Sequence, residues 1–224
     1  MTDNITGFRT DELLFAGKRA MEFQEFLIRR AFGFFYGIWA VDFLLLVMGS
    51  FFLGQTVDSI FTIIGILTGF FVSRNVFRKS KKTSRFRNSI EASREKRFGS
   101  GIGGITLIMI LVYVILTALI LFDAADRRYV LDAGIVSIII LYSAGSFGSF
   151  YIHYMSLRRL TFEGIIAPAS LFVGGISEVA AGLGILEQNL LLIIWTMVIA
   201  SWMIASIISF YQSTEVLGGL DGGE

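Results

Sequence analysis

Residues 190–211 read LLLIIWTMVIASWMIASIISFY, an apolar run of 22 residues that contains no charged side chain. A helix that crosses a bilayer needs about 20 such residues, because the hydrocarbon core is about 30 Å thick. Across all 224 residues, 54% are AVILMFWYC and the mean hydropathy is +0.72, which exceeds what a water-soluble core of this size requires. The composition therefore predicts an all-α, polytopic transmembrane helical bundle.

Five further apolar stretches precede this run, so we expect six membrane spans. They would form one domain over 31–211, between an N-terminal segment 1–30 and a short cytoplasmic tail 212–224. The expected spans cover roughly 31–54, 59–73, 105–122, 134–155, 164–186 and 190–211. The second stretch is the shortest of the six, and the others come close to the usual length of a span.

Lysine and arginine alternate between the expected loops, which predicts the orientation. The N-terminal segment, the 74–97 loop and the loop after the fourth span hold 17 of the 19 basic residues. Basic residues are retained on the cytoplasmic side, so both termini should lie in the cytoplasm of a cell that carries this protein in its plasma membrane. Met1 to Thr10 shows no cleavable signal pattern, and we expect the first span to direct its own insertion.

Residues 10–30 have the pattern of an amphipathic helix. Thr10 is a candidate N-cap, and one face of the segment carries apolar side chains at a spacing of three or four residues. The other face pairs Lys18 with Glu22 and Glu25 with Arg29, four residues apart. Such a helix can lie at the membrane surface or dock on a partner protein, and the sequence leaves both roles open.

The loop over 74–97 is the most basic part of the chain. It has ten basic residues against Glu91 and Glu95, a net charge of +8. Attraction to anionic lipid and docking of an acidic cytoplasmic partner both suit this loop, whereas nucleic-acid binding is not expected because no base-reading element accompanies the charge. The docking candidates are Arg78, Lys79, Lys81, Lys82, Arg85, Arg87, Arg94, Lys96 and Arg97.

Two carboxylates fall inside the expected spans, Asp42 in the first and Glu178 in the fifth. A charge in the bilayer costs several kcal/mol, so each side chain should face the bundle interior. Counted along their helices, the two lie at similar depth and could approach one another. A proton relay or cation site is one reading, and two separate carboxylates hydrogen-bonded for structural reasons is the other.

The fifth span is expected to be the least regular helix. It contains the only proline of the chain, Pro168, and the pair Gly174 and Gly175. Proline removes a backbone donor and glycine weakens a helix, so these three positions are candidates for a kink or a break. A broken span is typical of transporter binding sites.

No residue pattern indicates enzymatic or cofactor chemistry. Cysteine is absent, which excludes disulfides, thiolate metal sites and cysteine nucleophiles. His153 is the only histidine and lies near the cytoplasmic end of the fourth span, where we expect it to anchor the helix at the interface. A metal site is not expected, because His153 and Asp42 differ by more than about 10 Å in depth.

The layout resembles the permease subunit of a six-span ABC exporter of the ABC-2 type. Residues 10–30 occupy the place of that family's interface helix, 55–58 that of its short first outer turn, and 74–97 that of the loop that docks a separate ATPase. The resemblance implies a transport protein, not an enzyme in its own right, with a cytoplasmic ATPase as partner and without a bound cofactor.

Two other function classes stay open. One is a small proton- or cation-coupled transporter or channel that works as an oligomer, with Asp42 and Glu178 on its pathway. The other is an accessory subunit that contributes helices to a larger membrane complex and carries no chemistry.

Overall fold

The computed structural model describes residues 4–52, nine residues between 64 and 75, residues 127–157 and residues 159–221. Within these residues the chain is helical and contains no strand. Its four long helices are α1 (Asn4–Phe52), α4 (Arg127–Leu157), α5 (Phe162–Gly182) and α6 (Gln188–Asp221), with short helical pieces over 64–75. The expectation of an all-α protein is confirmed for this part of the chain.

Among the described residues, three helices are long and apolar enough to cross a membrane. They are Gly17–Gly49 within α1, Phe162–Gly182, and Gln188–Gly218 within α6. The expected span 134–155 falls inside α4. The expected span 105–122, the docking candidates of the basic loop and most of the expected span 59–73 lie outside the described residues.

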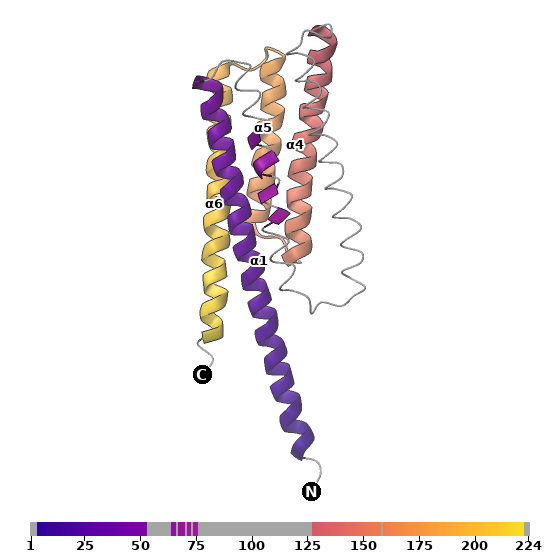
Figure 1. Ribbon diagram of the computed structural model, residues 1–224, viewed down its shortest axis with the longest axis vertical. Helices are drawn as coiled ribbons and strands as arrows, with labels where there is room; N and C mark the ends of the chain where they lie inside the picture. The colour runs from indigo at the N-terminus through magenta and orange to yellow at the C-terminus, as the bar shows by residue number, and fades with distance from the viewer. Residues whose placement is uncertain are drawn as a thin grey trace.

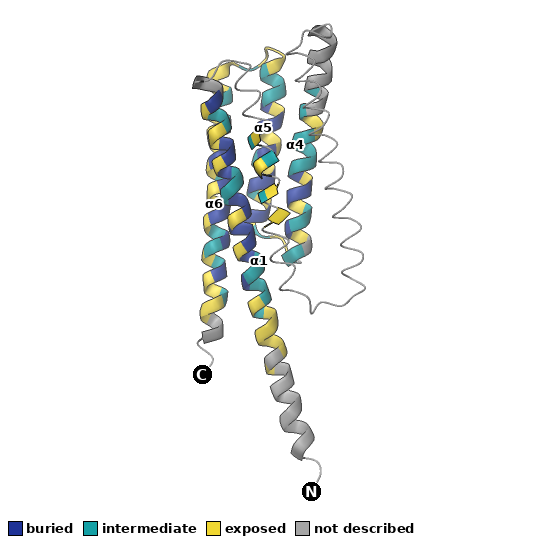
Figure 2. Cartoon of the chain, viewed as in Figure 1, coloured by how far each residue is buried: buried dark blue, intermediate teal, exposed yellow. Residues whose placement is uncertain are grey.

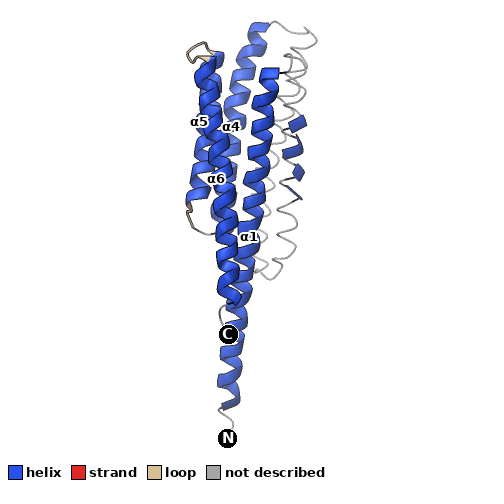
Figure 3. Cartoon of the chain, turned by 90° about the vertical axis from the view of Figure 1, so that its left-hand side faces the viewer, coloured by secondary structure: helices blue, strands red, loops and turns tan. Residues whose placement is uncertain are grey.

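The four helices run up and down in alternation (Figures 1 and 3). α1 ends at the end of the bundle where α4 begins, and α5 and α6 are joined by a turn at that same end. The chain's two termini and the connection from α4 to α5 lie toward the opposite end. We call this opposite end the terminal end of the bundle.

The helix boundaries differ from the expected ones. An apolar stretch predicts which residues can lie in lipid, but it does not predict where the helix begins and ends. The segment 10–30 is continuous with the first span in one 49-residue helix, so no break separates it from the bilayer segment. α6 continues to Asp221 through most of the expected tail. There, the hydroxyls of Ser213 and Thr214 donate to the carbonyls three residues earlier and satisfy polar groups within the helix.

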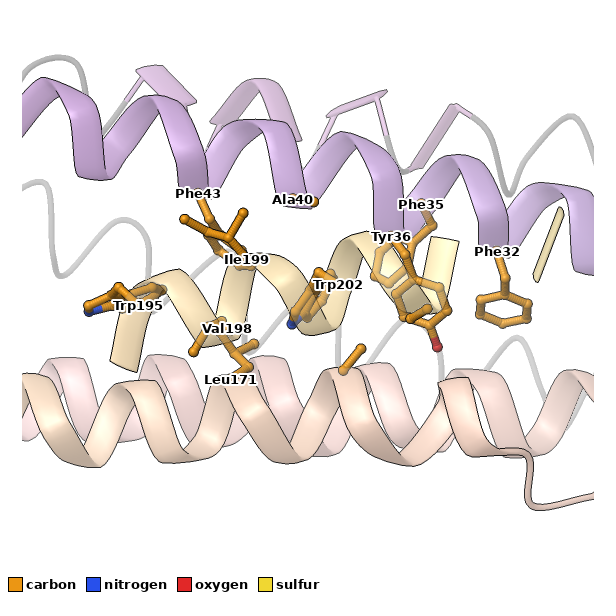
Figure 4. Close-up of a cluster of buried hydrophobic side chains, with 12 residues drawn as sticks. Phe32, Phe35, Tyr36, Ala40, Phe43, Leu171, Trp195, Val198, Ile199 and Trp202 are labelled. Atoms are coloured by element: carbon orange, nitrogen blue, oxygen red, sulfur yellow. The ribbon is translucent and has the colours of Figure 1, made fainter. Parts of the chain in front are cut away.

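The core lies mainly between α1 and α6 (Figure 4). The buried residues of each helix recur at alternating three- and four-residue steps: Arg29, Gly33, Tyr36, Ala40 and Phe43 on α1, and Trp195, Ile199, Trp202, Ser206, Ser209 and Ser213 on α6. This spacing of about 3.5 residues is typical of helices that pack side by side along their length. Figure 2 shows the resulting buried stripe between the two helices, with exposed residues on the outer face of α6.

Glycine and small residues bring α1 against α6. A Cβ added at Gly33 would stand 2.9 Å from the ring of Phe210, and one at Gly37 would stand 3.0 Å from the hydroxyl of Ser206. Ser206 also donates a hydrogen bond of 2.7 Å to the carbonyl of Gly33. The motif Gly33-x-x-x-Gly37 therefore serves packing within this chain.

α5 is one continuous helix through Pro168, Gly174 and Gly175, so the described backbone has no break at these positions. Instead, the two glycines allow close approach: a Cβ at Gly174 would stand 3.0 Å from Val198 of α6, and one at Gly175 would stand 2.5 Å from Tyr142 of α4. The carbonyl of Pro168 accepts a hydrogen bond of 2.5 Å from Ser146 of α4. These contacts place α5 between α4 and α6.

Candidate functional site

A buried polar cluster lies at the terminal end of the bundle, where all four long helices contribute a side chain. We define the polar cluster as Arg29 and Tyr36 of α1, His153 of α4, Thr161 and Glu163 at the start of α5, and Gln212 of α6. Its ionisable members are almost inaccessible to solvent, because the exposed fraction is 4% for Arg29, 2% for His153 and 0% for Glu163. Charged groups are buried at this level only where they are paired or functional.

Arg29 connects three helices. Its Nε donates to Glu25 Oε1 of the same helix at 2.8 Å, and its Nη1 lies 3.5 Å from Glu163 Oε1 of α5 and donates to Gln212 Oε1 of α6. Arg159 donates to the same oxygen of Glu25 from the α4–α5 connection. The pairing of Glu25 with Arg29 predicted from their spacing is confirmed, as is the pair Lys18–Glu22 at 3.9 Å.

Glu163 belongs to the first turn of α5, where the helix dipole favours a negative charge. Its Oε1 lies 3.5 Å from Arg29 Nη1 and 3.9 Å from His153 Nε2. Its Oε2 is buried and has no hydrogen-bond partner within the part of the chain that the structure describes. The carboxylate is thus held on one side only, which is uncommon for a group that is fully removed from water.

His153 is buried as an internal bridge between helices, and its expected role as an anchor at the membrane interface stays a prediction. Its Nδ1 lies 2.8 Å from the hydroxyl of Tyr36, and its Nε2 lies 2.6 Å from the hydroxyl of Thr161. Both hydroxyls can donate or accept, so either tautomer of the imidazole is satisfied. Thr161 is the N-cap residue of α5, and its hydroxyl makes no capping bond because it is engaged by His153.

Gly164 makes room for the imidazole. A Cβ at this position would overlap the His153 ring, as the Cβ position lies against the ring's Cδ2 atom. The ring also packs on Phe32, with 4.4 Å between the ring centres. Helical periodicity places His153 on the face of α4 that carries Ser146 and Ser149, which are buried as well.

An open groove of about 610 Å³ borders the polar cluster. It runs between the α4–α5 connection and the last turns of α6, and two arginines and one glutamate line it together with apolar side chains. The lining residues are Arg29, Arg159, Leu160, Thr161, Phe162, Gln212, Glu215 and Val216. The groove gives Arg29 its small remaining exposure to solvent.

Asp42 forms a second buried polar position, deep within the bundle. It lies 13 residues from Arg29, about 20 Å further along α1. Its carboxylate faces Gly65 and Gly69 on the short helical pieces over 64–75. Asp42 Oδ2 is buried without a hydrogen-bond partner among the described residues.

Glu178 has a partner of its own. Its Oε2 accepts a hydrogen bond of 2.7 Å from Trp195 Nε1 of α6. Trp195 packs on Phe43, which lies next to Asp42 in the sequence, but Asp42 itself faces the glycines at 65 and 69. Among the described residues, these contacts of the two carboxylates are therefore with different partners.

Sequence reasoning found Asp42 and Glu178 but missed most of the polar cluster. Arg29 had a partner within its own helix, so nothing in the sequence demanded a second one on α5. Glu163 stands at the edge of an expected span, where a carboxylate at the membrane surface is ordinary. The available signal was the string Arg159-Leu-Thr-Phe-Glu163, which places a helix cap and a first-turn acid directly after a basic connection.

Within the described ranges, no group of three histidine or acidic side chains comes together. No known protein family, curated protein or solved structure matches this chain.

Proposed function

We propose that this chain is the permease subunit of a multi-subunit transporter, embedded in the membrane and driven by a separate cytoplasmic ATPase. The observation that carries the proposal is the extension of α1 beyond the terminal end of the bundle (Figure 1). The candidate span within α1 has 33 residues and measures about 50 Å, well over the 30 Å or so of a hydrocarbon core. Arg29 contacts the first turn of α5, so the residues before it extend past the start of that helix.

The exposed side chains of this extension suit a protein partner. Phe15, Met21 and Phe23 are about half exposed or more, and Lys18 and Arg19 lie between them. A helix with apolar anchors and basic neighbours fits an apolar groove with an acidic rim. An ATPase that presents such a groove could bind the extension, and the basic loop 74–97 would add charge attraction from the same side of the membrane.

A six-span chain with both termini on one side is compatible with the directions of the described helices. α1, α4, α5 and α6 overlap four of the expected spans in sequence, and α1 ends at the end of the bundle from which α4 starts. This arrangement requires the chain between α1 and α4 to cross the membrane an even number of times. The two expected spans 59–73 and 105–122 meet that requirement.

Co-purification tests the proposal. A tagged chain extracted in mild detergent should retain an ATPase, and the variant Met21→Ala with Phe23→Ala should release it while remaining folded. The matched control is Met203→Ala with Ile207→Ala, which also removes two exposed apolar side chains but from α6 within the bundle. A stable assembly that lacks any ATPase would contradict the proposal and favour an accessory subunit of another membrane complex.

A further inference from the structure

Asp42 is a carboxylate without a visible counter-charge in the middle of the bundle. Its exposed fraction is 9%, and its Oδ2 has no hydrogen-bond partner in the described segments. Arg29 and Arg30 of its own helix lie at least about 18 Å away along the axis. Arg74, at the end of the helical pieces over 64–75, is exposed and stands five residues beyond Gly69. A buried, uncompensated carboxylate costs several kcal/mol, so its retention calls for a physical reason.

The side chain points into a slot made by two glycines one helical turn apart. A Cβ at Gly65 would stand 2.9 Å from Asp42 Oδ1, and one at Gly69 would stand 3.0 Å from Asp42 Oδ2. Any larger residue at either position would push against the carboxylate. The motif Gly65-x-x-x-Gly69 therefore gives space to a charged group here, whereas Gly33-x-x-x-Gly37 receives the side chains of α6.

The described walls of the slot are apolar. Trp39 and Leu46 lie next to the glycines at 3.2 Å from the added Cβ positions, and neither carries a charge. Lysine, arginine, histidine and a second carboxylate are absent from the described contacts of Asp42. Among the described residues nothing neutralises a charge on Asp42, and a bound cation would do so.

We propose that Asp42 and the glycine slot form a binding site for one monovalent cation, either a proton or Na⁺. This proposal does not depend on the ATPase partner, and cation binding can be measured on the isolated protein. A bound cation would neutralise Asp42 and remove the free-energy penalty for burying its charge. In a transporter, cation binding would thereby favour the contact between α1 and the helical pieces over 64–75.

Carbodiimide labelling tests the site, because dicyclohexylcarbodiimide is soluble in lipid and reacts with buried protonated carboxyls. Peptide mass analysis of the protein in detergent should find the adduct on Asp42 and lose it in Asp42→Asn. Glu178→Gln is the matched control and should keep the adduct. If Na⁺ is the ligand, added NaCl should slow labelling while KCl does not; if the proton is the ligand, labelling should slow as pH rises, without an effect of Na⁺.

A second measurement covers the case in which Asp42→Asn does not fold. The infrared carboxyl band of the unmodified protein should change on a pH step or on exchange of K⁺ for Na⁺, and the same change should persist in Glu178→Gln. Gly65→Ala should weaken the response, because its Cβ crowds Oδ1, whereas Gly182→Ala, which has no neighbour within 4 Å, should leave it unchanged. Labelling of Asp42 that responds to neither pH nor Na⁺, or an adduct located elsewhere, would overturn the proposal.

Discussion

The substitution Gly164→Ala tests the polar cluster without removing any of its polar groups. A Cβ at this position overlaps the His153 ring, which is fixed by hydrogen bonds to Tyr36 at 2.8 Å and to Thr161 at 2.6 Å. Overpacking of this kind costs about 1–3 kcal/mol. If the ring moves instead, the two hydrogen bonds are lost or strained at about 0.5–1.5 kcal/mol each. Either way, we expect a loss of about 1–3 kcal/mol of unfolding free energy.

Gly182→Ala on the same helix is the matched control, because nothing lies within 4 Å of its added Cβ. Alanine is favoured over glycine in a helix by about 0.5–1 kcal/mol, so this variant should be neutral or slightly more stable. Thermal unfolding in detergent, followed by helical circular dichroism, compares the two. At about 2–4 °C per kcal/mol for a chain of this size, Gly164→Ala should melt about 2–12 °C lower. Equal melting temperatures for the two variants would show that His153 does not occupy this position.

Two further substitutions probe other contacts. Arg29→Gln should destabilise the protein by about 3–5 kcal/mol, since it leaves Glu163 buried without its cation. Arg30→Gln, on the exposed side, should cost at most about 1 kcal/mol through its contacts with Phe26 and Phe34. Similar losses for the two variants in a denaturant titration would argue against the ion pair. Gly175→Ala should cost about 1–3 kcal/mol, because its Cβ would meet Tyr142 at 2.5 Å. Gly145→Ala, whose nearest neighbour is Leu171 at 3.5 Å, should be tolerated, and an equal melting temperature for these two variants would contradict the close packing of α4 on α5.

The sequence predicted the helices better than it predicted their ends. A run such as 190–211 has to be a helix if it enters lipid, because no other single segment satisfies its backbone there. The ends are less certain, since a helix can continue into water whenever its residues allow it. α1 continues through Lys18, which pairs with Glu22, and α6 continues through Ser213, whose hydroxyl donates to the carbonyl of Phe210.

The partners of individual polar residues were harder to predict. Periodicity placed His153 on one face of α4, but it could not show that Tyr36, 117 residues away, lies opposite. Helix-breaking residues were similarly ambiguous. Gly174 and Gly175 weaken a helix in isolation, yet in α5 they permit contacts with Val198 and Tyr142 that hold the helix in place.

Single-cysteine labelling tests the membrane topology on which the rest depends, and the absence of native cysteine makes the background clean. Ile185 lies in the α5–α6 turn and is 76% exposed, and Leu160 lies in the α4–α5 connection and is 61% exposed. A maleimide that cannot cross membranes should label Ile185→Cys on intact cells and Leu160→Cys only after lysis. Labelling of both positions, or of Leu160→Cys alone, on intact cells would contradict a membrane-spanning bundle with its termini in the cytoplasm.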